Sequence, residues 1–459
     1  MKNTSLLSNT LLPLSEFTER RSQFLSSMPV NSVAIFFAAK EMTRSNDTEY
    51  PFCQGKNFYY LSGYSEPDAI LLLVKSAAVA EDNSTSGEQS ILFNRDKDAL
   101  QEIWHGRRIG QTAAVKDYGF SECYSLSEVD QVLPDYIADK EQLLFCQGQN
   151  EKFDSQVYAW LATVKGQSRS GVKAPTQLVD CSALVEDMRL IKSPAELDIM
   201  RQVNVISGDA HTRAMKASAV GSFEYQLEAA ILHEFAHNGA RHPAYGTIVA
   251  GGDNGNILHY TNNDDVLKNN ELVLIDAGGE LSGYAADITR TFPVNGKFTQ
   301  AQKAIYQLVL DAQNLAISAI KPQATFAELN TLVNNFLTTG LYELGILSGD
   351  LTLLLEEKAC KKYFIHGLGH WLGLDVHDVG DYQVNDQRQQ CRAFEQGMVM
   401  TIEPGLYIPL DDESVEEKWR GIAVRIEDNI AVTENGYENF TVNAPKSINN
   451  IESIMSTGK

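Results

Sequence analysis

Two pairs of apolar, strand-like segments in the second half of the chain carry acidic residues where a buried strand should be uncharged. The first pair is ELVLIDAG with YAADITRTFPV, and the second is GMVMTIEPGLYI with GIAVRIEDNIAV. A carboxylate taken into a protein interior must be paired or bound to a metal ion, because its desolvation is otherwise too costly. The pattern therefore predicts two antiparallel hairpins, each of which delivers two carboxylates.

These hairpins belong to a repeated order of elements. Apolar periodicity predicts four helices in the same region, over 194–216, 223–237, 300–320 and 326–344. Each half of the region then consists of two helices followed by a hairpin. An internal duplication would explain this order.

The earlier part of the chain follows another pattern. Strand-like runs alternate with helix-like runs, the strands at 33–38, 69–74, 91–93 and 143–146 and the helices at 15–28 and 151–164. This alternation predicts an α/β domain. A helix-start signal follows, with Ser193 as N-cap, Pro194 at the first helical position and Glu196 closing a capping box. We therefore predict one domain over 1–190 and a second over 191–459.

The negative net charge of the chain excludes some classes of binding partner. The 459 residues include 60 acidic and 38 basic side chains, a formal net charge of −22, and no basic run exceeds a pair. Phosphate backbones and anionic lipids would be repelled, so we expect no nucleic acid and no membrane as a partner. No apolar stretch is long enough to span a bilayer.

The beginning of the chain and its cysteines bear on the compartment. The segment MKNTSLLSNTLLPLSEF has one lysine, a broken apolar run and no small-residue cleavage site, so a cytoplasmic location is expected. Six cysteines are scattered with no CxxC pair, which predicts neither a disulfide framework nor a cysteine zinc site. We expect all six to be reduced and inert: Cys53, Cys123, Cys146, Cys181, Cys360 and Cys391.

Four carboxylates of the hairpins are candidates for a site. Asp276 ends the run LVLI, and Asp287 shares a face of its strand with Thr289 by period-two alternation. Glu403 ends a second apolar run before a Pro-Gly turn, and Glu427 lies in the strand that follows. Taken singly, each acid would more often be a surface or ion-paired residue. Four in matched hairpins favour a functional cluster.

Histidines concentrate in the segment FIHGLGHWLGLDVHD, which begins at Phe364. His366, His370 and His377 are a third of the nine histidines of the chain. A lone core histidine is usually structural, but glycines beside two histidines suit close approach of a ligand. His259 follows the glycine-rich stretch GGDNGN, which we interpret as a turn, and is another candidate.

A zinc-protease motif must be weighed against these candidates. His233, Glu234 and His237 match HExxH on a predicted helix. The glycine and third histidine that follow each come one residue too early for the longer metzincin pattern, and Asn238-Gly239 ends the helix at once. We do not expect a metal at this motif.

Together these features resemble aminopeptidase P, the Xaa-Pro aminopeptidase branch of the pita-bread metallopeptidases. HGLGHWLGLDVHDVG is typical of aminopeptidase P and prolidase, and IDAG, DITRTFPVNGKFT, TIEPGLY and RIED follow in the order of the family. TRSNDTEYPFCQGKNFYYLSGYSEPDA and EIWHGRRIG resemble the aminopeptidase P branch itself. The resemblance covers essentially the whole chain. It implies an α/β amino-terminal domain followed by an α+β pita-bread catalytic domain with an internal pseudo-twofold repeat.

The resemblance also implies a dinuclear metal site, usually of manganese. Asp276 would chelate one ion, His370 and Glu403 would hold the other, and Asp287 and Glu427 would bridge them. Four carboxylates and one imidazole form a hard ligand set, which favours Mn²⁺ over metals that prefer thiolates. Two such ions generate a hydroxide nucleophile at neutral pH.

Further roles follow from the same resemblance. Glu403 would carry a proton to the leaving nitrogen. His259 and His377 would steady the oxyanion, and His366 and Arg425 would line the proline subsite.

The resemblance implies a homo-oligomer as well, with a tetramer as the expected state. Trp104 and Arg169 of a neighbouring subunit's amino-terminal domain would help to wall the site. From composition alone, Trp104 could equally be an ordinary core aromatic residue.

Two other functions remain open from the sequence. A prolidase shares the metal ligands but must recognise the free carboxylate of a dipeptide, and Arg425 could serve either activity. A pita-bread protein that has lost catalysis could act as a binding module, although such proteins generally lack ligands that are all present here. The sequence-based interpretation is therefore an Xaa-Pro aminopeptidase acting on peptides with proline in second position.

Overall fold

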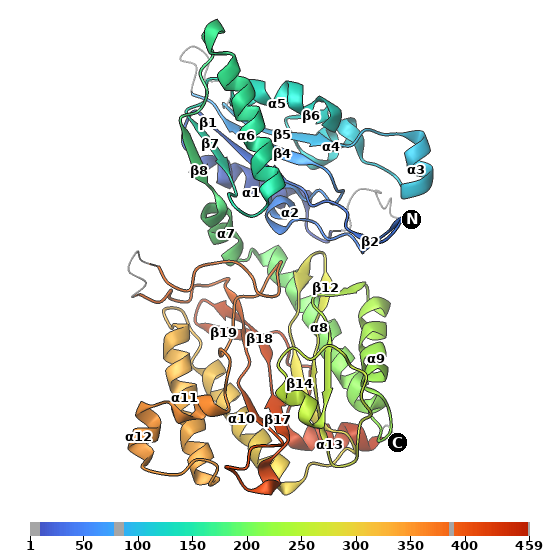
Figure 1. Cartoon of the computed structure of the whole chain (residues 1–459), viewed down its shortest axis with the longest axis vertical. Coiled ribbons are helices and arrows are strands. Elements are labelled where there is room, and N and C mark those ends of the chain that lie inside the picture. Colours follow the sequence, from blue (N-terminus) through green and yellow to red (C-terminus); the bar gives the residue numbers. More distant parts are fainter. Residues whose placement is uncertain (1–9, 78–86, 385–389, 458–459) are drawn as a thin grey trace. The chain divides into compact units, whose positions relative to one another are not determined.

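A computed structural model describes residues 10–77, 87–384 and 390–457. The chain divides into two compact units, Met1–Arg189 and Leu190–Lys459, which Figure 1 shows in blue to green and in green to red. Among the described helices, none is long and apolar enough to cross a membrane.

The first unit is built on one mixed six-stranded sheet. Its strand order is β6 (Glu122–Ser125), β5 (Glu88–Asn94), β4 (Ile70–Lys75), β1 (Ser32–Phe37), β7 (Gln142–Phe145) and β8 (Gln177–Asp180). The β1/β4 and β4/β5 pairs are antiparallel, whereas β5/β6, β1/β7 and β7/β8 are parallel. Thr43–Ser45 and Thr48–Glu49 form a separate short hairpin, β2 and β3.

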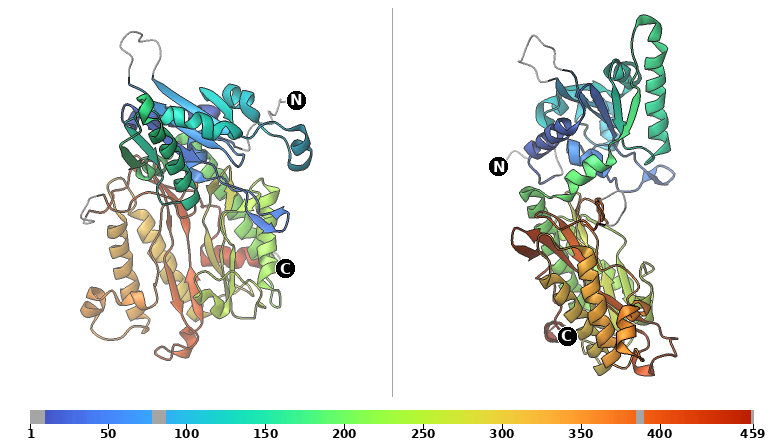
Figure 2. Two further views of the ribbon diagram at one scale, coloured as in Figure 1. Left: turned by 45° about the horizontal axis from the view of Figure 1, so that its top comes forward. Right: turned by 90° about the vertical axis from the view of Figure 1, so that its left-hand side faces the viewer.

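Helices cover both faces of this sheet, as the views of Figure 2 show. The helices of this unit are α1 (Leu14–Ser27), α2 (Lys56–Ser62), α3 (Ala99–His105), α4 (Gly110–Tyr118), α5 (Val129–Ile137), α6 (Glu151–Gly166) and α7 (Ser182–Leu190); α3 projects away from the sheet, and α7 leads into the second unit. Ile35 packs in one cluster with Leu133 of α5 and Trp160 of α6, while the neighbouring Phe36 meets Phe24 of α1 with ring centroids 5.2 Å apart. Burial on both faces explains why these strands read as continuous apolar runs.

The second unit combines small antiparallel sheets with two pairs of long helices. The helices are α8 (Pro194–Ala217), α9 (Glu224–His237), α10 (Gln300–Ser318) and α11 (Phe326–Glu343), with shorter α12 (Leu351–Glu356) and α13 (Ile448–Thr457). In Figure 1 the strands run between the green pair α8/α9 and the orange pair α10/α11. The predicted capping box is present, since Ser193 Oγ accepts from Glu196 N and Glu196 Oε2 accepts from Ser193 N.

The first predicted hairpin of this unit is present. β11 (Leu272–Asp276) pairs antiparallel with β14 (Thr289–Pro293), so that Asp276 lies opposite Thr289. β10 (Ile248–Gly251) flanks β11 on its other side. The short strands β12 (Gly279–Leu281) and β13 (Tyr284–Ala285) pair with each other within the connection, and β12 also pairs with β9 (His242–Pro243).

The second predicted hairpin is present but broken at its acids. β15 (Val399–Ile402) pairs with β18 (Asp428–Thr433), and β16 (Gly405–Ile408) pairs with β17 (Ile422–Arg425); β19 (Gly436–Asn439) pairs with the far edge of β18. Pro404 has no N–H to donate to the ladder, so the strand is interrupted just after Glu403. The interruption leaves Glu403 and Glu427 side by side at the break between two ladders.

Candidate metal centre

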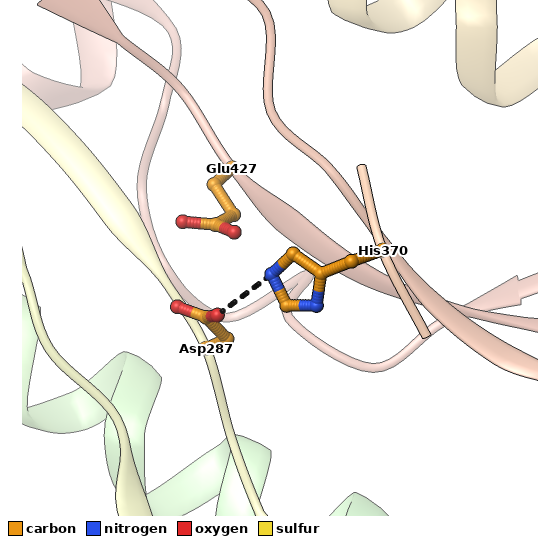
Figure 3. A group of neighbouring side chains, drawn as sticks. All are labelled: Asp287, His370 and Glu427. Carbon is orange, nitrogen blue, oxygen red and sulfur yellow. Dashed lines mark ion pairs between the residues drawn. The ribbon is translucent and has the colours of Figure 1, made fainter. Parts of the chain in front are cut away.

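Asp287, His370 and Glu427 each offer a ligand atom, and these three atoms lie within 4.8 Å of one another. Figure 3 shows the three side chains converging from separate segments of the second unit. Asp287 precedes β14, Glu427 lies between β17 and β18, and His370 lies in the histidine-rich loop. His370 Nε2 is 3.4 Å from Asp287 Oδ2.

Glu403 joins this group beside His370. Its Oε1 lies 3.5 Å from His370 Nε2 and accepts a hydrogen bond from Thr401 Oγ1 at 3.2 Å. Thr401 Oγ1 also accepts from the His370 backbone N–H at 3.0 Å. One hydroxyl therefore positions both the imidazole segment and the carboxylate.

Asp276 reaches the group through a tyrosine. The Tyr245 hydroxyl lies 2.6 Å from Asp276 Oδ1 and 2.6 Å from Asp287 Oδ1. A single hydroxyl hydrogen cannot serve both carboxylates at once. With this contact, the five predicted ligand residues lie around one site: Asp276, Asp287, His370, Glu403 and Glu427.

The tautomer of His370 suits a ligand. Its Nδ1 donates to the Trp371 carbonyl at 2.9 Å, which leaves the Nε2 lone pair directed at the carboxylates. Metal-bound histidines commonly have their second nitrogen held in this way. Burial disfavours the charged ring, but the hydrogen bond and charge of Asp287, with the charge of Glu403, raise the pKa of His370 to about 9. When no cation is bound, the protonated His370 ring compensates the negative charge of the neighbouring carboxylates.

The four carboxylates are crowded, with Asp287 and Glu427 buried and Asp276 and Glu403 partly buried. Burial raises the pKa of Glu403 to about 7, against the opposing charge of His370 and with a contribution from Asp287. Burial, followed by the charges of Asp287 and Glu403, raises the pKa of Glu427 well above its ordinary value. Burial also raises the pKa of Asp276, although Arg425 opposes this. Three acids with raised pKa values, gathered around a fourth carboxylate, fit a divalent cation site.

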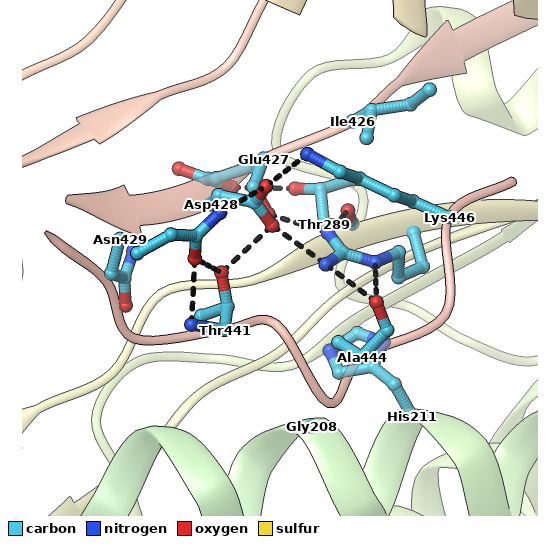
Figure 4. A network of polar contacts seen from close by, with 12 residues as sticks. Gly208, His211, Thr289, Ile426, Glu427, Asp428, Asn429, Thr441, Ala444 and Lys446 are labelled. Atoms are coloured by element: carbon cyan, nitrogen blue, oxygen red, sulfur yellow. Dashed lines mark hydrogen bonds and ion pairs between the residues drawn. The ribbon is translucent and has the colours of Figure 1, made fainter. Parts of the chain in front are cut away.

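A network of charged side chains fixes the segment that carries Glu427 (Figure 4). Arg290 Nη1 donates to the Glu427 carbonyl at 2.6 Å, and its Nη2 contacts Asp428 Oδ1 at 2.6 Å. Lys446 Nζ binds the second oxygen of Asp428. Arg290 and Asp428 are fully buried. Because both charges are compensated, the pair can hold Glu427 in a fixed position.

Gln313 of α10 holds the two broken strands together. Its Nε2 donates to the carbonyls of Ile402 and Ile426, each at 3.1 Å. These residues directly precede Glu403 and Glu427. Gln313 is fully buried, and its Oε1 accepts from Lys446. One amide therefore sets the spacing between two candidate ligands.

Arg425 is buried beside the carboxylates rather than free in the site. Its Nη2 donates to Asp276 Oδ2 at 2.6 Å, its Nε to Thr289 Oγ1 at 3.0 Å and its Nη1 to the Tyr407 hydroxyl at 2.8 Å. The Tyr407 hydroxyl also lies 2.8 Å from His366 Nε2. The guanidinium thus anchors Asp276 and, through Tyr407, orients His366.

The other predicted histidines differ in their exposure. The rings of His377 and His370 lie 4.2 Å apart, and His377 is exposed. His366 is largely buried, and burial, with the charge of Arg425, lowers its pKa to about 3, so it is neutral at physiological pH. His259 is exposed, and its charge contributes to lowering the pKa of both His366 and His377, after the larger effects of burial.

The two residues predicted to act on a neighbouring subunit belong to the first unit. Trp104 lies on α3 with 76% of its surface exposed, so it is not a core residue in this chain. Arg169 lies in the short 3₁₀ turn Ser168–Ser170 and is exposed.

The side chains of the zinc-protease motif contact one another and an arginine of the neighbouring helix. His233 and His237 stack against each other with ring centroids 5.7 Å apart, and both are exposed on α9. Glu234 pairs instead with Arg213.

Three positioning residues could not be identified from the sequence. Tyr245 lies in an irregular segment with no periodicity, and Gln313 looks like an ordinary polar residue of a helix. Tyr407 occupies an apolar strand position. Thr289, by contrast, was placed near the site by the sequence, because the alternation of its strand puts its side chain on the same face as that of Asp287.

Comparison with known proteins agrees with this geometry. Residues 198–434 match Metallopeptidase family M24, and residues 17–145 match the aminopeptidase P N-terminal domain. The Xaa-Pro aminopeptidase of Escherichia coli K12 is 45% identical over 440 residues, which cover 96% of this chain and 97% of that protein. Human Xaa-Pro aminopeptidase 3 is 35% identical, covering 90% of this chain and 78% of its own.

Solved structures show the same fold along nearly the whole length. E. coli aminopeptidase P with the inhibitor Pro-Leu superposes with a TM-score of 0.92 at 44% identity, covering 97% of this chain and 99% of that one. Proline aminopeptidase P II of Yersinia pestis gives 0.93 at 46% identity, covering 97% and 100%. The expected architecture, an α/β domain followed by a pita-bread domain, is confirmed. This chain is therefore a member of Metallopeptidase family M24, in the branch that carries the aminopeptidase P N-terminal domain.

Proposed function

We propose that this chain is an Xaa-Pro aminopeptidase, which releases the first residue from peptides that have proline in second position. The observation that carries the proposal is the convergence of four carboxylates, two buried and two partly buried, and one oriented imidazole on a single site. The relatives named Xaa-Pro aminopeptidase, which match over nearly the full chain, support this substrate class.

The cofactor we propose is a pair of divalent ions, with manganese as the expected metal. Asp276 would chelate one ion, His370 and Glu403 the other, and Asp287 and Glu427 would bridge them. An oxygen-rich set with one nitrogen suits Mn²⁺, although one solved relative is described as zinc-substituted. When bound, such a pair supplies a hydroxide nucleophile at neutral pH.

The side chains of this chain would manage the protons and the substrate. Glu403, whose pKa burial raises to about 7, is suited to accept a proton and pass it to the leaving nitrogen. The exposed His259 and His377 are available to donate to the developing oxyanion. Neutral His366, held by Tyr407, would form one side of the proline subsite.

Proline explains why a dedicated site is needed. Its nitrogen has no N–H, and its ring fixes the backbone, so a pocket shaped for an ordinary second residue does not align the bond. The hydrogen bonds that join Arg425 to Tyr407 and Tyr407 to His366 would hold one wall of this subsite in place. Arg425 would therefore act mainly by positioning Asp276 and Tyr407.

The contacts of Arg425 weigh against a prolidase. A dipeptidase needs a cation free to bind the substrate carboxylate, and Arg425 was the candidate for that role. In the structure its guanidinium already binds Asp276 at 2.6 Å. An inactive binding protein is disfavoured as well, because all five ligand residues are present around one site.

The proposal also includes the oligomeric state and the compartment of the protein. We expect a homo-oligomer, a tetramer, in which Trp104 and Arg169 of one subunit wall the site of the next. The exposure of Trp104 supports a role in contacts. The expected compartment is the cytoplasm, and the peptide is the expected partner.

Selectivity among short peptides tests the proposal. Metal-loaded enzyme is offered Ala-Pro-Ala, Ala-Ala-Ala and the dipeptide Ala-Pro, and released alanine is measured. Rapid cleavage of Ala-Pro-Ala alone supports an aminopeptidase with proline specificity. Faster cleavage of Ala-Pro would make the enzyme a prolidase, and equal cleavage of both tripeptides would refute the proline subsite.

A further inference from the structure

Cys146 and Cys181 are neighbours in the first unit although they are distant in sequence. The register of the parallel strands β7 and β8 ends with Phe145 opposite Asp180. Continuing that register by one residue places Cys146 opposite Cys181, and the Cys181 N–H donates to the Phe145 carbonyl at 3.3 Å. Adjacent positions on paired strands have the separation that a disulfide requires.

The two thiols influence each other's ionisation. Interaction with Cys181 lowers the pKa of Cys146, interaction with Cys146 raises the pKa of Cys181, and both cysteines are free thiols. Cys146 is half-buried, whereas Cys181 is buried. An oxidant from solvent would therefore react first with Cys146, and Cys181 would act as the resolving thiol.

The surroundings of Cys146 favour a thiolate. The hydrogen bond from Cys181 lowers the pKa of Cys146, burial and Asp180 oppose this, and Ser182 and Asn57 lower it further. Asn57 is fixed from its other side, because its Oδ1 accepts from Arg189 at 2.7 Å. The pair also lies at the N-terminus of α7, where the helix dipole favours a negative sulfur.

From this arrangement we propose that Cys146 and Cys181 form a redox-active dithiol, which peroxides or other two-electron oxidants convert to a disulfide. The Cys146 thiolate attacks one peroxide oxygen, so an S–O bond forms, the O–O bond breaks and hydroxide leaves. Cys181 then attacks the sulfenic sulfur, so an S–S bond forms and the oxygen leaves as water with the proton of Cys181. Two thiols are oxidised, and one peroxide is reduced to two waters.

This proposal changes the expectation that all six cysteines are inert. The sequence contained no CxxC signal, because β7 and β8 are separated by the whole of α6. Only the pairing of the strands brings the thiols together. Cys123 offers a matched comparison, because it is also half-buried in this unit but contacts an amide, Asn94 Oδ1, at 3.3 Å.

The test is a non-reducing peptide map of the full chain after brief treatment with hydrogen peroxide and alkylation. We expect the Cys146 and Cys181 peptides to be linked, lighter by two hydrogens than their sum, and released by dithiothreitol. Cys53 and Cys123 should remain alkylated as single peptides. Finding Cys146 and Cys181 both alkylated, or Cys146 oxidised to a sulfinic acid while Cys181 stays free, would overturn the proposal.

Single variants separate the attacking role of Cys146 from the resolving role of Cys181, and Cys123→Ser controls for general effects of losing a cysteine. In Cys181→Ser, Cys146 should stop at a sulfenic acid that dimedone traps, whereas in Cys146→Ser the thiol of Cys181 should stay reduced. Phenylarsine oxide, which bridges neighbouring thiols, should bind the unmodified chain and Cys123→Ser with equal affinity. It should bind the Cys146→Ser chain at least tenfold more weakly. Equal binding to all three would show that the thiols do not act as a pair.

Discussion

Arg425 and Asp276 form an ion pair at the edge of the candidate metal centre, with Nη2 2.6 Å from Oδ2. The arginine side chain is 5% exposed and the aspartate side chain 13%. The guanidinium also contacts Thr289 and Tyr407. The carboxylate of Asp276, a candidate ligand, is thus oriented by protein contacts alone, which would limit the reorganisation that metal binding requires.

Replacing Arg425 by lysine should separate charge from orientation. Lysine keeps the positive charge but cannot reach Asp276, Thr289 and Tyr407 together. Losing two of these buried guanidinium hydrogen bonds would cost on the order of 3 kcal/mol, and the same loss in the transition state would correspond to roughly 100-fold in kcat/KM. Arg420→Lys is the matched control, because the native Arg420 side chain donates to the Val415 carbonyl, away from the candidate ligands. An R425K enzyme with unchanged kinetics and metal content would contradict the anchoring role.

Tyr407→Phe should uncouple His366 from Arg425. The variant loses only a hydroxyl, which joins Arg425 Nη1 and His366 Nε2 at 2.8 Å each. We expect about a tenfold loss in kcat/KM for Xaa-Pro peptides, within the cost of one or two hydrogen bonds to a charged or neutral partner. Metal content should stay unchanged, and Tyr437→Phe, at a 42% exposed tyrosine, should behave as the native enzyme. An equal loss in both variants would speak against this contact.

Gln313→Leu should loosen the spacing of Glu403 and Glu427. The carbonyls of Ile402 and Ile426 would lose their shared donor in a buried place, at a cost of roughly 2 kcal/mol in the free energy of unfolding. Urea unfolding of the metal-free protein measures this cost, and Mn²⁺ titration should show weaker binding. Gln307→Leu changes an exposed glutamine of the same helix and should do neither. Native metal affinity in Q313L would disprove the spacing role.

His211 should make stability depend on pH. It is fully buried on α8, its Nε2 lies 3.0 Å from the Ala277 carbonyl, and burial lowers its pKa to about 3. The unfolded chain binds the proton below its ordinary pKa of about 6.5, whereas the folded chain does not. The stabilisation is therefore complete above this pH and lost progressively as pH falls toward 3.

Between pH 7 and pH 5 this one group should cost about 2 kcal/mol of unfolding free energy. Urea unfolding of metal-free native protein and of His211→Gln at both pH values measures the difference. The variant should lose less stability than the native protein over this interval. Identical pH dependence in the two proteins would show that His211 is not the source.

The long helices and the most apolar strands were predictable, because their signals lie in adjacent residues, whereas shorter elements such as α2, α3 and α7 were not predicted. The capping residues Ser193 and Glu196 fixed the start of α8, and apolar periodicity located the other long helices within a few residues. The ligand candidates were visible because an acid at the end of an apolar strand is costly unless it is compensated.

What the sequence could not predict depends on contacts between distant segments. The break of the second hairpin at Glu403 and Glu427 interrupts two continuous apolar patterns, and only Pro404 marked it locally. Tyr245 and Gln313 matter because of what they touch across the fold. The pairing of Cys146 with Cys181 likewise exists only once β7 and β8 lie in register.

The most direct test of the central claim is release of the first residue from an Xaa-Pro-Xaa tripeptide by chelator-stripped enzyme, before and after Mn²⁺ is restored. We predict no release from the stripped enzyme and recovery that saturates at two ions per chain. His370→Ala should remain inactive with Mn²⁺, while His233→Ala, at the exposed zinc-protease motif, should recover fully. Release that is independent of metal, or full recovery in His370→Ala, would contradict the assignment of the metal centre.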